Sequence, residues 1–422
     1  MRIFEEMESE VRGYVRSFPT IFDVAQGSEL FDESGARFID FFAGAGVLNY
    51  GHNHPMITEA IIEYLQRNGI VHGLDKATIA KRAFLQKFRD TILAPRNLQY
   101  KVQFTGPTGT NAVETALKLA RMVKQRSNVI AFTNGYHGLT MGALAATGNY
   151  FYKDESYGSR ANTAFMPFDG FLGEDVNTID YLRKFLSDNS SGIDLPAAII
   201  VETVQGEGGV NVASIEWLKG LQDVCREFDI LLIIDDIQVG NGRTGTFFSF
   251  ERAGIHPDMV TLSKSIGGGL PMALLLMRPE LDQWQPGEHT GTFRGNNLAF
   301  IAATQALNFW DNDDLAKAVE YKGNLLKTEL EKIAADFPEF DPKVRGLGMI
   351  YALELPNGVA SETSAEAFER GLVIETAGAD DQVLKFLPSL LIDEDLLHEG
   401  LGIIRESLKV LSERRDKMMT GQ

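Results

Sequence analysis

Hydrophobic and polar positions follow two patterns through the middle of the chain, short apolar runs and longer amphipathic segments. The apolar runs are rich in Val, Ile and Leu and hold almost no polar position, which is typical of strands buried on both faces. The amphipathic segments repeat apolar residues at the roughly 3.6-residue period of a helix. These patterns predict strands at Asn128–Thr133, Ala197–Val201, Ile230–Ile234 and Met259–Leu262, and helices at Ala112–Lys124 and Ile215–Phe228.

The order of these elements, with strands and helices in alternation, predicts the class of fold. Buried strands separated by helices form a mostly parallel sheet covered by helices, so we expect an α/β protein. Functional side chains in such sheets gather at the carboxyl ends of the strands. Glu202, Asp235 and Lys264 each stand directly after or at the end of a predicted strand. We therefore expect the functional site at this edge of the sheet.

The two ends of the chain show a different pattern, in which short strands mix with helices. Glu29–Phe42 predicts a hairpin whose turn is the polar stretch Asp32–Gly35. We expect residues 1–54 and 311–422 to combine into one smaller α+β domain beside a large domain of residues 55–310. The C-terminal part predicts helices at Leu315–Asp336, Ala365–Arg370 and Leu396–Leu411, and strands at Met349–Leu355 and Val383–Leu387.

The charge of the chain restricts its partners. The 422 residues carry a net charge of −18, from 58 acidic and 40 basic residues. Negative charge repels the phosphates of nucleic acids and of anionic lipids, so we expect neither nucleic acid nor membrane as a partner. The acidity either serves solubility or suits a salt-rich cell interior, because salt screens the self-repulsion of the chain.

Three further features concern location and metal binding. No apolar run approaches the about 20 residues of a membrane-spanning helix, and Met1–Glu6 is too acidic for a signal peptide. Cys225 is the only cysteine, which excludes intrachain disulfides and cysteine-rich metal sites. No His, Cys, Asp or Glu residues have the spacing of metal ligands. We therefore expect a cytoplasmic protein without a metal.

A carboxylate and an amine at two strand ends give the strongest chemical signal. Asp235 ends the run Leu231–Ile234, and Lys264 follows Met259–Leu262 and precedes Gly267–Gly269. Pyridoxal phosphate needs both groups, since its ring nitrogen takes an anionic partner and its aldehyde takes an amine. Alone, each residue also has an ordinary explanation, a surface lysine or an aspartate that caps a turn. Their occurrence together favours a site for pyridoxal phosphate.

Residues close to this pair could complete such a site. Ile237 returns to the face of Asp235 and could pack on the ring, whereas Asp236 points the other way and is expected to be structural. Gln238 could reach the oxygen of the ring. Tyr136 could stack on the opposite ring face, although an isolated tyrosine of this kind is more often part of a core.

The segment Thr105–Asn111 precedes a predicted helix, and its small residues leave backbone N–H groups open to a phosphate. It is not a Walker A loop, because no Gly-Lys-Ser/Thr sequence follows, and many such turns only connect elements. His137 is not expected to act as an acid or base, since Lys264 takes that role. The two histidines of the Gly51–Pro55 loop are interpreted as structural.

Taken together, these motifs resemble the class III (ω-amino) aminotransferases, which are fold-type I pyridoxal phosphate enzymes. The resemblance runs nearly end to end, and it rests on the occurrence of all the motifs in one order. It implies a large domain with a mostly parallel sheet, and a smaller domain built from both termini. The motifs are Ile39–Gly44, Asn49–His52, Ala116–Arg121, Val201–Gly209, Asp235–Gln238 and Ser263–Pro271.

The resemblance also implies a role for each matching residue. Lys264 would carry the cofactor, and Asp235 would partner the nitrogen of its ring. The ring would lie between Ile237 and Tyr136, with Gln238 near its oxygen. The phosphate contacts would come from Gly109 and Thr110, and from Thr292 across a dimer interface, so that the family implies an obligate homodimer.

Four segments narrow the resemblance to one branch of the class, which makes L-2,4-diaminobutyrate for ectoine biosynthesis. That branch implies glutamate and aspartate 4-semialdehyde as substrates, and a compatible solute as end product fits the salt-adapted interpretation of the charge. The segments are Ser17–Pro19, Gly69–Asp75, Gly106–Glu114 and Gly138–Asn149. The alternatives are transfer from ornithine, acetylornithine or 4-aminobutyrate, and, more distantly, an aminomutase.

A second alternative is a non-catalytic regulator that uses the same fold. Regulators of that type add a basic DNA-binding domain, and this chain has neither the spare length nor a basic face for one.

Two cations depart from the pattern of the broader class. Lys385 stands where many members have an arginine that pairs with a substrate carboxylate, and Arg294 replaces a small residue. We expect one of these two cations to bind the substrate carboxylates. Glu207 matches a glutamate that masks the arginine when no carboxylate is present. The resemblance therefore implies a switch between Glu207 and Lys385.

Overall fold

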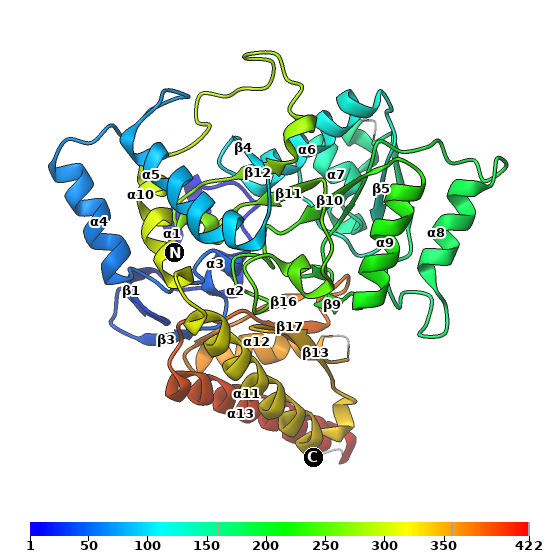
Figure 1. Ribbon diagram of the computed structural model, residues 1–422. Coiled ribbons are helices and arrows are strands. Elements are labelled where there is room, and N and C mark those ends of the chain that lie inside the picture. The colour runs from blue at the N-terminus through cyan, green and yellow to red at the C-terminus, as the bar shows by residue number, and fades with distance from the viewer. Residues whose placement is uncertain (159, 357, 421–422) are drawn as a thin grey trace.

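The computed structural model describes residues 1–158, 160–356 and 358–420, and in this part of the chain seven strands form one central sheet (Figure 1). Five neighbouring strands, β11, β10, β7, β5 and β6, run parallel, and β12 runs antiparallel to both of its neighbours. The sheet confirms the predicted α/β fold. In spatial order its strands are β4 (Lys101–Phe104), β12 (Leu274–Met277), β11 (Met259–Leu262), β10 (Leu231–Asp235), β7 (Ala198–Val201), β5 (Val129–Phe132) and β6 (Thr163–Met166).

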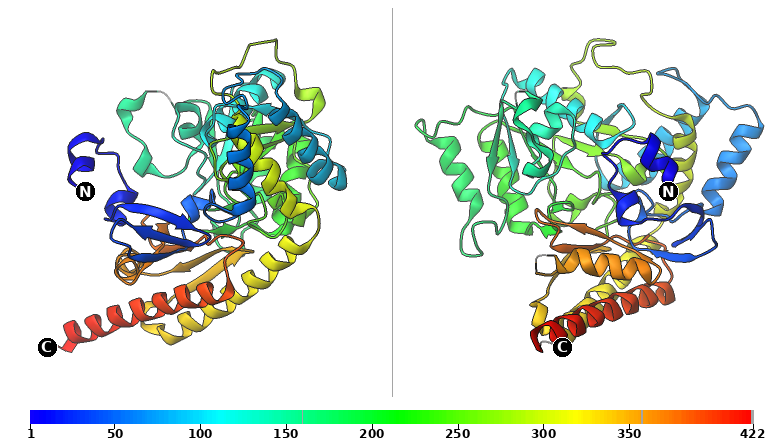
Figure 2. Two further views of the ribbon diagram at one scale, coloured as in Figure 1. Left: turned by 90° about the vertical axis from the view of Figure 1, so that its left-hand side faces the viewer. Right: turned by 180° about the vertical axis from the view of Figure 1, so that it is seen from behind.

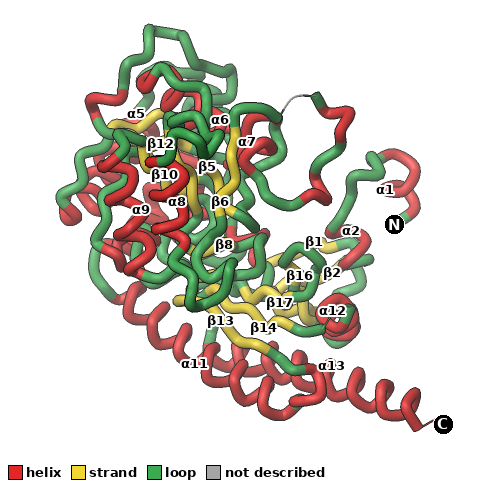
Figure 3. The backbone as a smooth tube through the Cα atoms, turned by 90° about the vertical axis from the view of Figure 1, so that its right-hand side faces the viewer, coloured by secondary structure: helices red, strands yellow, loops and turns green. Residues whose placement is uncertain are grey.

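Helices cover both faces of this sheet because each buried strand sends alternate side chains to opposite sides. Ile233 of β10 belongs to the apolar cluster that includes Val113 and Leu117 of α6 (Gly109–Lys124). Its neighbours Leu232 and Ile234 belong to the other cluster, with Leu218 and Leu221 of α9 (Ile215–Glu227). The helices form the outer layers around the strands in Figure 3.

The predicted helix at Ala112–Lys124 begins three residues too late. In the structure α6 starts at Gly109. The Gly-Thr-Asn sequence suggests a turn, but the N–H groups of a first helical turn need no partner inside the helix, so weak helix formers are tolerated there. The earlier start places Gly109 and Thr110 in the first turn of α6.

Three strands of the central sheet were not predicted. The edge strands β4 and β6 keep exposed or half-exposed positions, so they lack a continuous apolar run. The third strand, β12, does have a continuous apolar run. Its antiparallel direction in the sheet is set by its pairing with β11 and β4.

A smaller layer of strands and helices lies below the central sheet in Figure 1. Its sheet has the order β13–β14–β17–β16, and α13 projects from this part in Figure 2. The elements are α11 (Asp314–Asp336), β13 (Lys343–Leu347), β14 (Ile350–Glu354), α12 (Val359–Glu369), β16 (Glu375–Ala377), β17 (Val383–Phe386) and α13 (Glu394–Thr420).

The N-terminal and C-terminal parts of the chain share a third sheet. The antiparallel strands β1, β2 and β3 continue into β15, which pairs with β3 in parallel. This pairing supports one smaller domain built from both termini, while the boundaries at residues 54 and 310 stay a prediction. The strands are β1 (Phe22–Gln26), β2 (Glu29–Asp32), β3 (Arg37–Asp40) and β15 (Leu372–Val373).

The remaining elements connect these layers. Within the described residues, no helix combines the length and the apolar character needed to span a membrane. The connecting elements are α1 (Arg2–Met7), α2 (Tyr14–Ser17), α3 (Ala43–Gly46), α4 (Pro55–Gln66), α5 (Ile79–Lys87), α7 (Met141–Ala146), α8 (Thr178–Ser187), α10 (Asn297–Ala306) and the short pair β8 (Val204–Gln205) and β9 (Asn211–Val212).

Candidate active site

Lys264 follows β11 after the single residue Ser263, next to the end of the parallel strand β10. Its backbone is left-handed, with a φ of 53°, which costs a non-glycine residue of the order of 1–3 kcal/mol and is found most often at functional sites. The Lys264 Nζ donates a hydrogen bond of 2.9 Å to the carbonyl oxygen of Ala45. Burial lowers the pKa of this amine. A lowered pKa makes the neutral, nucleophilic form of the amine more available.

Asp235 ends β10, and hydrogen bonds hold both of its buried carboxylate oxygens. Oδ2 lies 2.7 Å from Nδ1 of His137, and Oδ1 accepts from the Thr261 hydroxyl at 3.1 Å and from the Ile237 N–H at 3.2 Å. Burial alone would lower the pKa of His137, but the hydrogen bond and charge of Asp235 outweigh it and raise this pKa. The carboxylate is therefore fixed in one orientation. The sequence did not predict the contact with His137.

Asp236 points away from this site, as its place in the strand pattern predicts. Its carboxylate accepts hydrogen bonds from the backbone N–H and the hydroxyl of Ser249. Burial raises the pKa of Asp236 to about 7. These contacts support a structural role for Asp236.

The first turn of α6 lies against the side chain of Ile237. A Cβ added to Gly109 would lie 3.0 Å from the Ile237 side chain, so the two residues are in close approach. The Thr110 hydroxyl lies 2.6 Å from that of Thr140. Among the described residues, no side chain caps the N-terminus of α6. The positive end of this helix therefore keeps backbone N–H groups available for a phosphate.

Gln238 keeps one polar atom without a partner among the described residues. Its amide nitrogen donates 3.0 Å hydrogen bonds to the Ala45 carbonyl oxygen and to Glu207 Oε1. Its Oε1 is buried and has no hydrogen-bond partner. Buried polar atoms are rarely left unpaired, so this atom marks a place for a polar ligand group. With Asp235, Lys264 and the first turn of α6, it fits the predicted cofactor.

Substituting Gly206 by alanine tests this cradle. The new Cβ would lie 1.7 Å from Gln238 Oε1, which forces the amide of Gln238 away from its place. We expect Gly206→Ala to weaken the binding of pyridoxal phosphate by about 10-fold or more, as for the loss of one or two hydrogen bonds. An absorbance titration of the cofactor-free protein measures this. Gly402→Ala is the control, because among the described residues the added Cβ would meet no atom within 4 Å beyond the adjoining backbone of its own helix. Equal affinities in the two variants would contradict the prediction.

Lys385 lies between two carboxylates in the interior. Its side chain on β17 is 0% exposed, and Nζ lies 2.7 Å from Glu207 Oε1 and 3.1 Å from Glu375 Oε1. Burial alone would raise the pKa of Glu207, but the charges of Lys385 and Lys264 lower it to about 2. Burial raises the pKa of Glu375 to about 7, even though Lys385 opposes the change. The sequence predicted the pair of Glu207 and Lys385 but not the place of Glu375.

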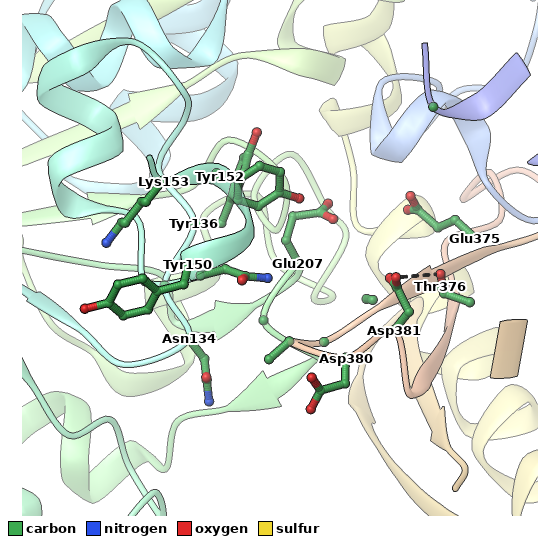
Figure 4. Close-up of a pocket in the computed structure, with 18 of the residues that line it drawn as sticks. Asn134, Tyr136, Tyr150, Tyr152, Lys153, Glu207, Glu375, Thr376, Asp380 and Asp381 are labelled. Atoms are coloured by element: carbon green, nitrogen blue, oxygen red, sulfur yellow. Dashed lines mark hydrogen bonds between the residues drawn. The ribbon is translucent and has the colours of Figure 1, made fainter. Parts of the chain in front are cut away.

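A cavity of about 1080 Å³ opens beside this group (Figure 4). Its described lining includes Glu207, Glu375 and Tyr136, whose ring centre is 5.6 Å from that of Tyr152. Burial raises the pKa of Tyr136 to about 12, so its hydroxyl stays protonated at neutral pH. The cavity therefore lies beside the carboxyl ends of the central strands, on the side where Glu207 and Tyr136 line it.

Glu202, at the end of β7, holds the backbone of this region. Its carboxylate accepts from the N–H groups of Tyr136 at 2.9 Å and Gly206 at 3.2 Å. Burial raises the pKa of Glu202 to about 7.

Two residues expected at the site, Thr292 and Arg294, lie elsewhere in this chain. Both belong to the loop before α10, which stands at the upper edge of Figure 1. Thr292 is exposed, and the Arg294 guanidinium donates to the hydroxyl of Thr290 at 3.1 Å. Of the two candidate cations, Lys385 is the one that lies beside Glu207. The contact of Thr292 with a phosphate across a dimer interface stays a prediction.

The sheet, the aspartate and the lysine together define a class of enzyme, the pyridoxal phosphate aminotransferases. The class-III aminotransferase family model matches residues 12–408, and the chain belongs to this family. The match confirms the family that the sequence motifs predicted.

Several individual proteins are similar to this chain along nearly its whole length. The chain is 66% identical over 420 residues to the diaminobutyrate–2-oxoglutarate transaminase of Wolinella succinogenes, which covers 99% of this chain and 98% of the relative. It is 53% identical over 421 residues to the enzyme of that name from Halalkalibacterium halodurans, with 99% of both chains covered. Among solved structures, the ornithine aminotransferase of Toxoplasma gondii ME49 has a TM-score of 0.85 at 25% identity, over 98% of this chain and 95% of that one.

Proposed function

We propose that this protein transfers the amino group of glutamate to L-aspartate 4-semialdehyde, which gives L-2,4-diaminobutyrate and 2-oxoglutarate. The observation that carries the proposal is the 66% identity, along nearly the whole chain, to a diaminobutyrate–2-oxoglutarate transaminase. The product places the reaction at the first step of ectoine biosynthesis. An obligate homodimer in the cytoplasm, with pyridoxal phosphate as cofactor, completes the proposal.

Pyridoxal phosphate, when bound, supplies an aldehyde that bonds to the substrate amine and a ring that accepts an electron pair. Lys264 would hold this aldehyde, and its amine, with its pKa lowered by burial, would act as the base and the acid that moves the proton of the substrate carbon bearing the reacting nitrogen. The carboxylate of Asp235, fixed by His137 and Thr261, holds a proton on the ring nitrogen. The first turn of α6 binds the phosphate.

The two substrates differ at the carbon next to the transferred amino group. Glutamate carries a carboxylate there, whereas the ω-end of diaminobutyrate carries only hydrogen. Lys385 binds the carboxylate of glutamate, and Glu207 returns to Lys385 when no carboxylate is present. The pairing of Glu207 with Lys385 at 2.7 Å is the form suited to the diamine.

Glu207→Ala is expected to separate the two half-reactions. Without Glu207, Lys385 keeps only Glu375 as a carboxylate partner and is more open to a substrate carboxylate, so kcat/KM for diaminobutyrate should fall about 10-fold relative to that for glutamate. Rapid mixing with each substrate gives the two values. Glu399→Ala is the control, because it removes an exposed ion pair with Arg37 outside the site. The side chain of Lys385 is 0% exposed, so this is not a surface ion pair. An unchanged ratio in Glu207→Ala would make the pair a permanent structural contact and would rule out the switch.

The substrate assignment is tested with a panel of amino donors. The purified protein is mixed with 2-oxoglutarate and each donor, and glutamate formation is followed. We expect the highest kcat/KM with L-2,4-diaminobutyrate. A higher value with ornithine, acetylornithine or 4-aminobutyrate would assign the protein to another substrate within the same family. Light scattering on the same sample tests the homodimer.

A further inference from the structure

The buried amine of Lys385 contacts two carboxylates, although the proposed switch needs only that of Glu207. Glu375 is its direct neighbour across β16 and β17, and the Glu375 Oε1 lies 3.1 Å from Nζ. Glu207 lies on the other side of the same amine. When both carboxylates are ionised, Lys385 is the only cation among the described residues that contacts either of them directly, and Lys264 acts on them from farther away. Two buried negative charges then share one direct cationic partner, which favours the approach of a further cation.

Glu375 reaches the surface of the cavity. Its side chain is among the residues that line the cavity, and Figure 4 shows the carboxylates of Glu207 and Glu375 facing each other. The hydroxyl of Tyr14 donates to Glu375 Oε2 at 3.3 Å. A carboxylate oxygen has two lone pairs, so Oε2 can accept one more hydrogen bond from a ligand in the cavity.

The charge of the cavity also suits a cationic ligand. Its described lining holds more carboxylates than cations, and Asp381 is held by the Thr376 hydroxyl at 3.1 Å. Because the pKa of Glu375 is raised to about 7, a bound cation would favour its ionised form. The lining carboxylates are Glu207, Glu375, Asp380 and Asp381, and the lining cations are Lys153 and Arg160.

We propose that Glu375, oriented by Tyr14, binds the second ammonium group of a diamino acid substrate and so selects it over ω-amino acids with a single amino group. The inference rests on the proposed function, in which diaminobutyrate reacts at its ω-end and keeps its α-ammonium group free. A hydrogen bond between an ammonium and a carboxylate is among the strong ones. A substrate that lacks the ammonium leaves Glu375 to share the amine of Lys385 with Glu207, and it is selected against.

The test compares two substrates that differ only in the α-ammonium group, L-2,4-diaminobutyrate and 4-aminobutyrate. In the holoenzyme, Glu375→Gln should lower the ratio of their kcat/KM values roughly 10- to 100-fold, as for the loss of a hydrogen bond to a charged group. The amide keeps the shape of the side chain and can still accept from Tyr14. Tyr14→Phe should shift the ratio in the same direction by less, because it removes only the group that orients Glu375.

Asp381→Asn is the matched control, since it removes a carboxylate of the same cavity that does not contact Lys385. A fall of both kcat/KM values by one factor in Glu375→Gln would make Glu375 only a structural support of Lys385 and would overturn the inference. An equal fall of the ratio in Asp381→Asn would also overturn it, because selection would then depend on the general charge of the cavity. The proposed function is judged separately, from the donor preference of the unsubstituted protein.

Discussion

Replacing Lys264 by alanine is expected to reduce steady-state transamination to below detection, a loss of at least about 10⁴-fold. The variant loses both the amine that holds the cofactor and the base that moves the proton, and no other described amine contacts the carbonyl of Ala45. The visible absorbance of the bound cofactor should disappear as well. Initial rates with diaminobutyrate and 2-oxoglutarate, together with an absorbance spectrum, measure both effects.

Lys322→Ala provides the matched control for this loss. Lys322 is also a half-buried lysine whose pKa is lowered by burial, and it donates to the carbonyl oxygens of Leu390 and Ile392 at 3.1 and 2.7 Å. It lies on α11, away from the strand ends. We expect a lower melting temperature for this variant but a normal spectrum. Turnover or visible absorbance that survives in Lys264→Ala would overturn the assignment of Lys264.

The second large effect is expected for Asp235→Asn. The amide keeps the shape of the side chain but loses the charge that holds a proton on the ring nitrogen of the cofactor. We expect kcat to fall by about 10²–10³-fold, the range for removal of a preorganised electrostatic contact. The hydrogen bond to His137 should weaken too, since the charge of Asp235 raises the pKa of that histidine. Steady-state kinetics at saturating substrate and cofactor give kcat.

The neighbouring residue supplies the comparison for Asp235. Asp236→Asn changes the next aspartate, which is equally buried but binds Ser249 on the other side of the strand. Burial raises the pKa of Asp236 and so favours its neutral form, which means that loss of its charge should cost little. We expect a kcat within about twofold of that of the unsubstituted protein, because Asp236 contacts Ser249 and faces away from the cofactor site. Equal losses in the two variants would show that burial, rather than the ring nitrogen, explains the effect at Asp235.

The sheet and its main chemical pair could be predicted because the signals are local. A strand buried on both faces must be apolar throughout, so Leu231–Ile234 and Met259–Leu262 were recognised from the sequence alone. The carboxyl ends of parallel strands meet at one edge, which brings Asp235 and Lys264 together once the strands are assigned. The other cofactor residues come from the resemblance to the family, and their contacts with the cofactor stay predictions.

Residues that depend on contacts between distant segments were not predictable. The partners of Asp235 and Lys264, His137 and the carbonyl of Ala45, come from other parts of the chain. Ala45 itself has a left-handed backbone with a φ of 56°, which no pattern of side chains indicates. Arg294 shows the opposite case, because a departure from the family pattern made it a candidate for the substrate carboxylates, while its guanidinium contacts the Thr290 hydroxyl in the loop before α10.

The sequence by itself determined the α/β sheet, the family and the place of a carboxylate and an amine at the ends of two strands, because hydrophobic periodicity and motif order are properties of short segments. Only the tertiary structure decided which charges share the interior. Glu207 and Lys385 are 178 positions apart, and Glu375 joins them through the register of β16 with β17. Pairing of charges depends on strand register and on burial, and both are fixed only when the whole chain packs.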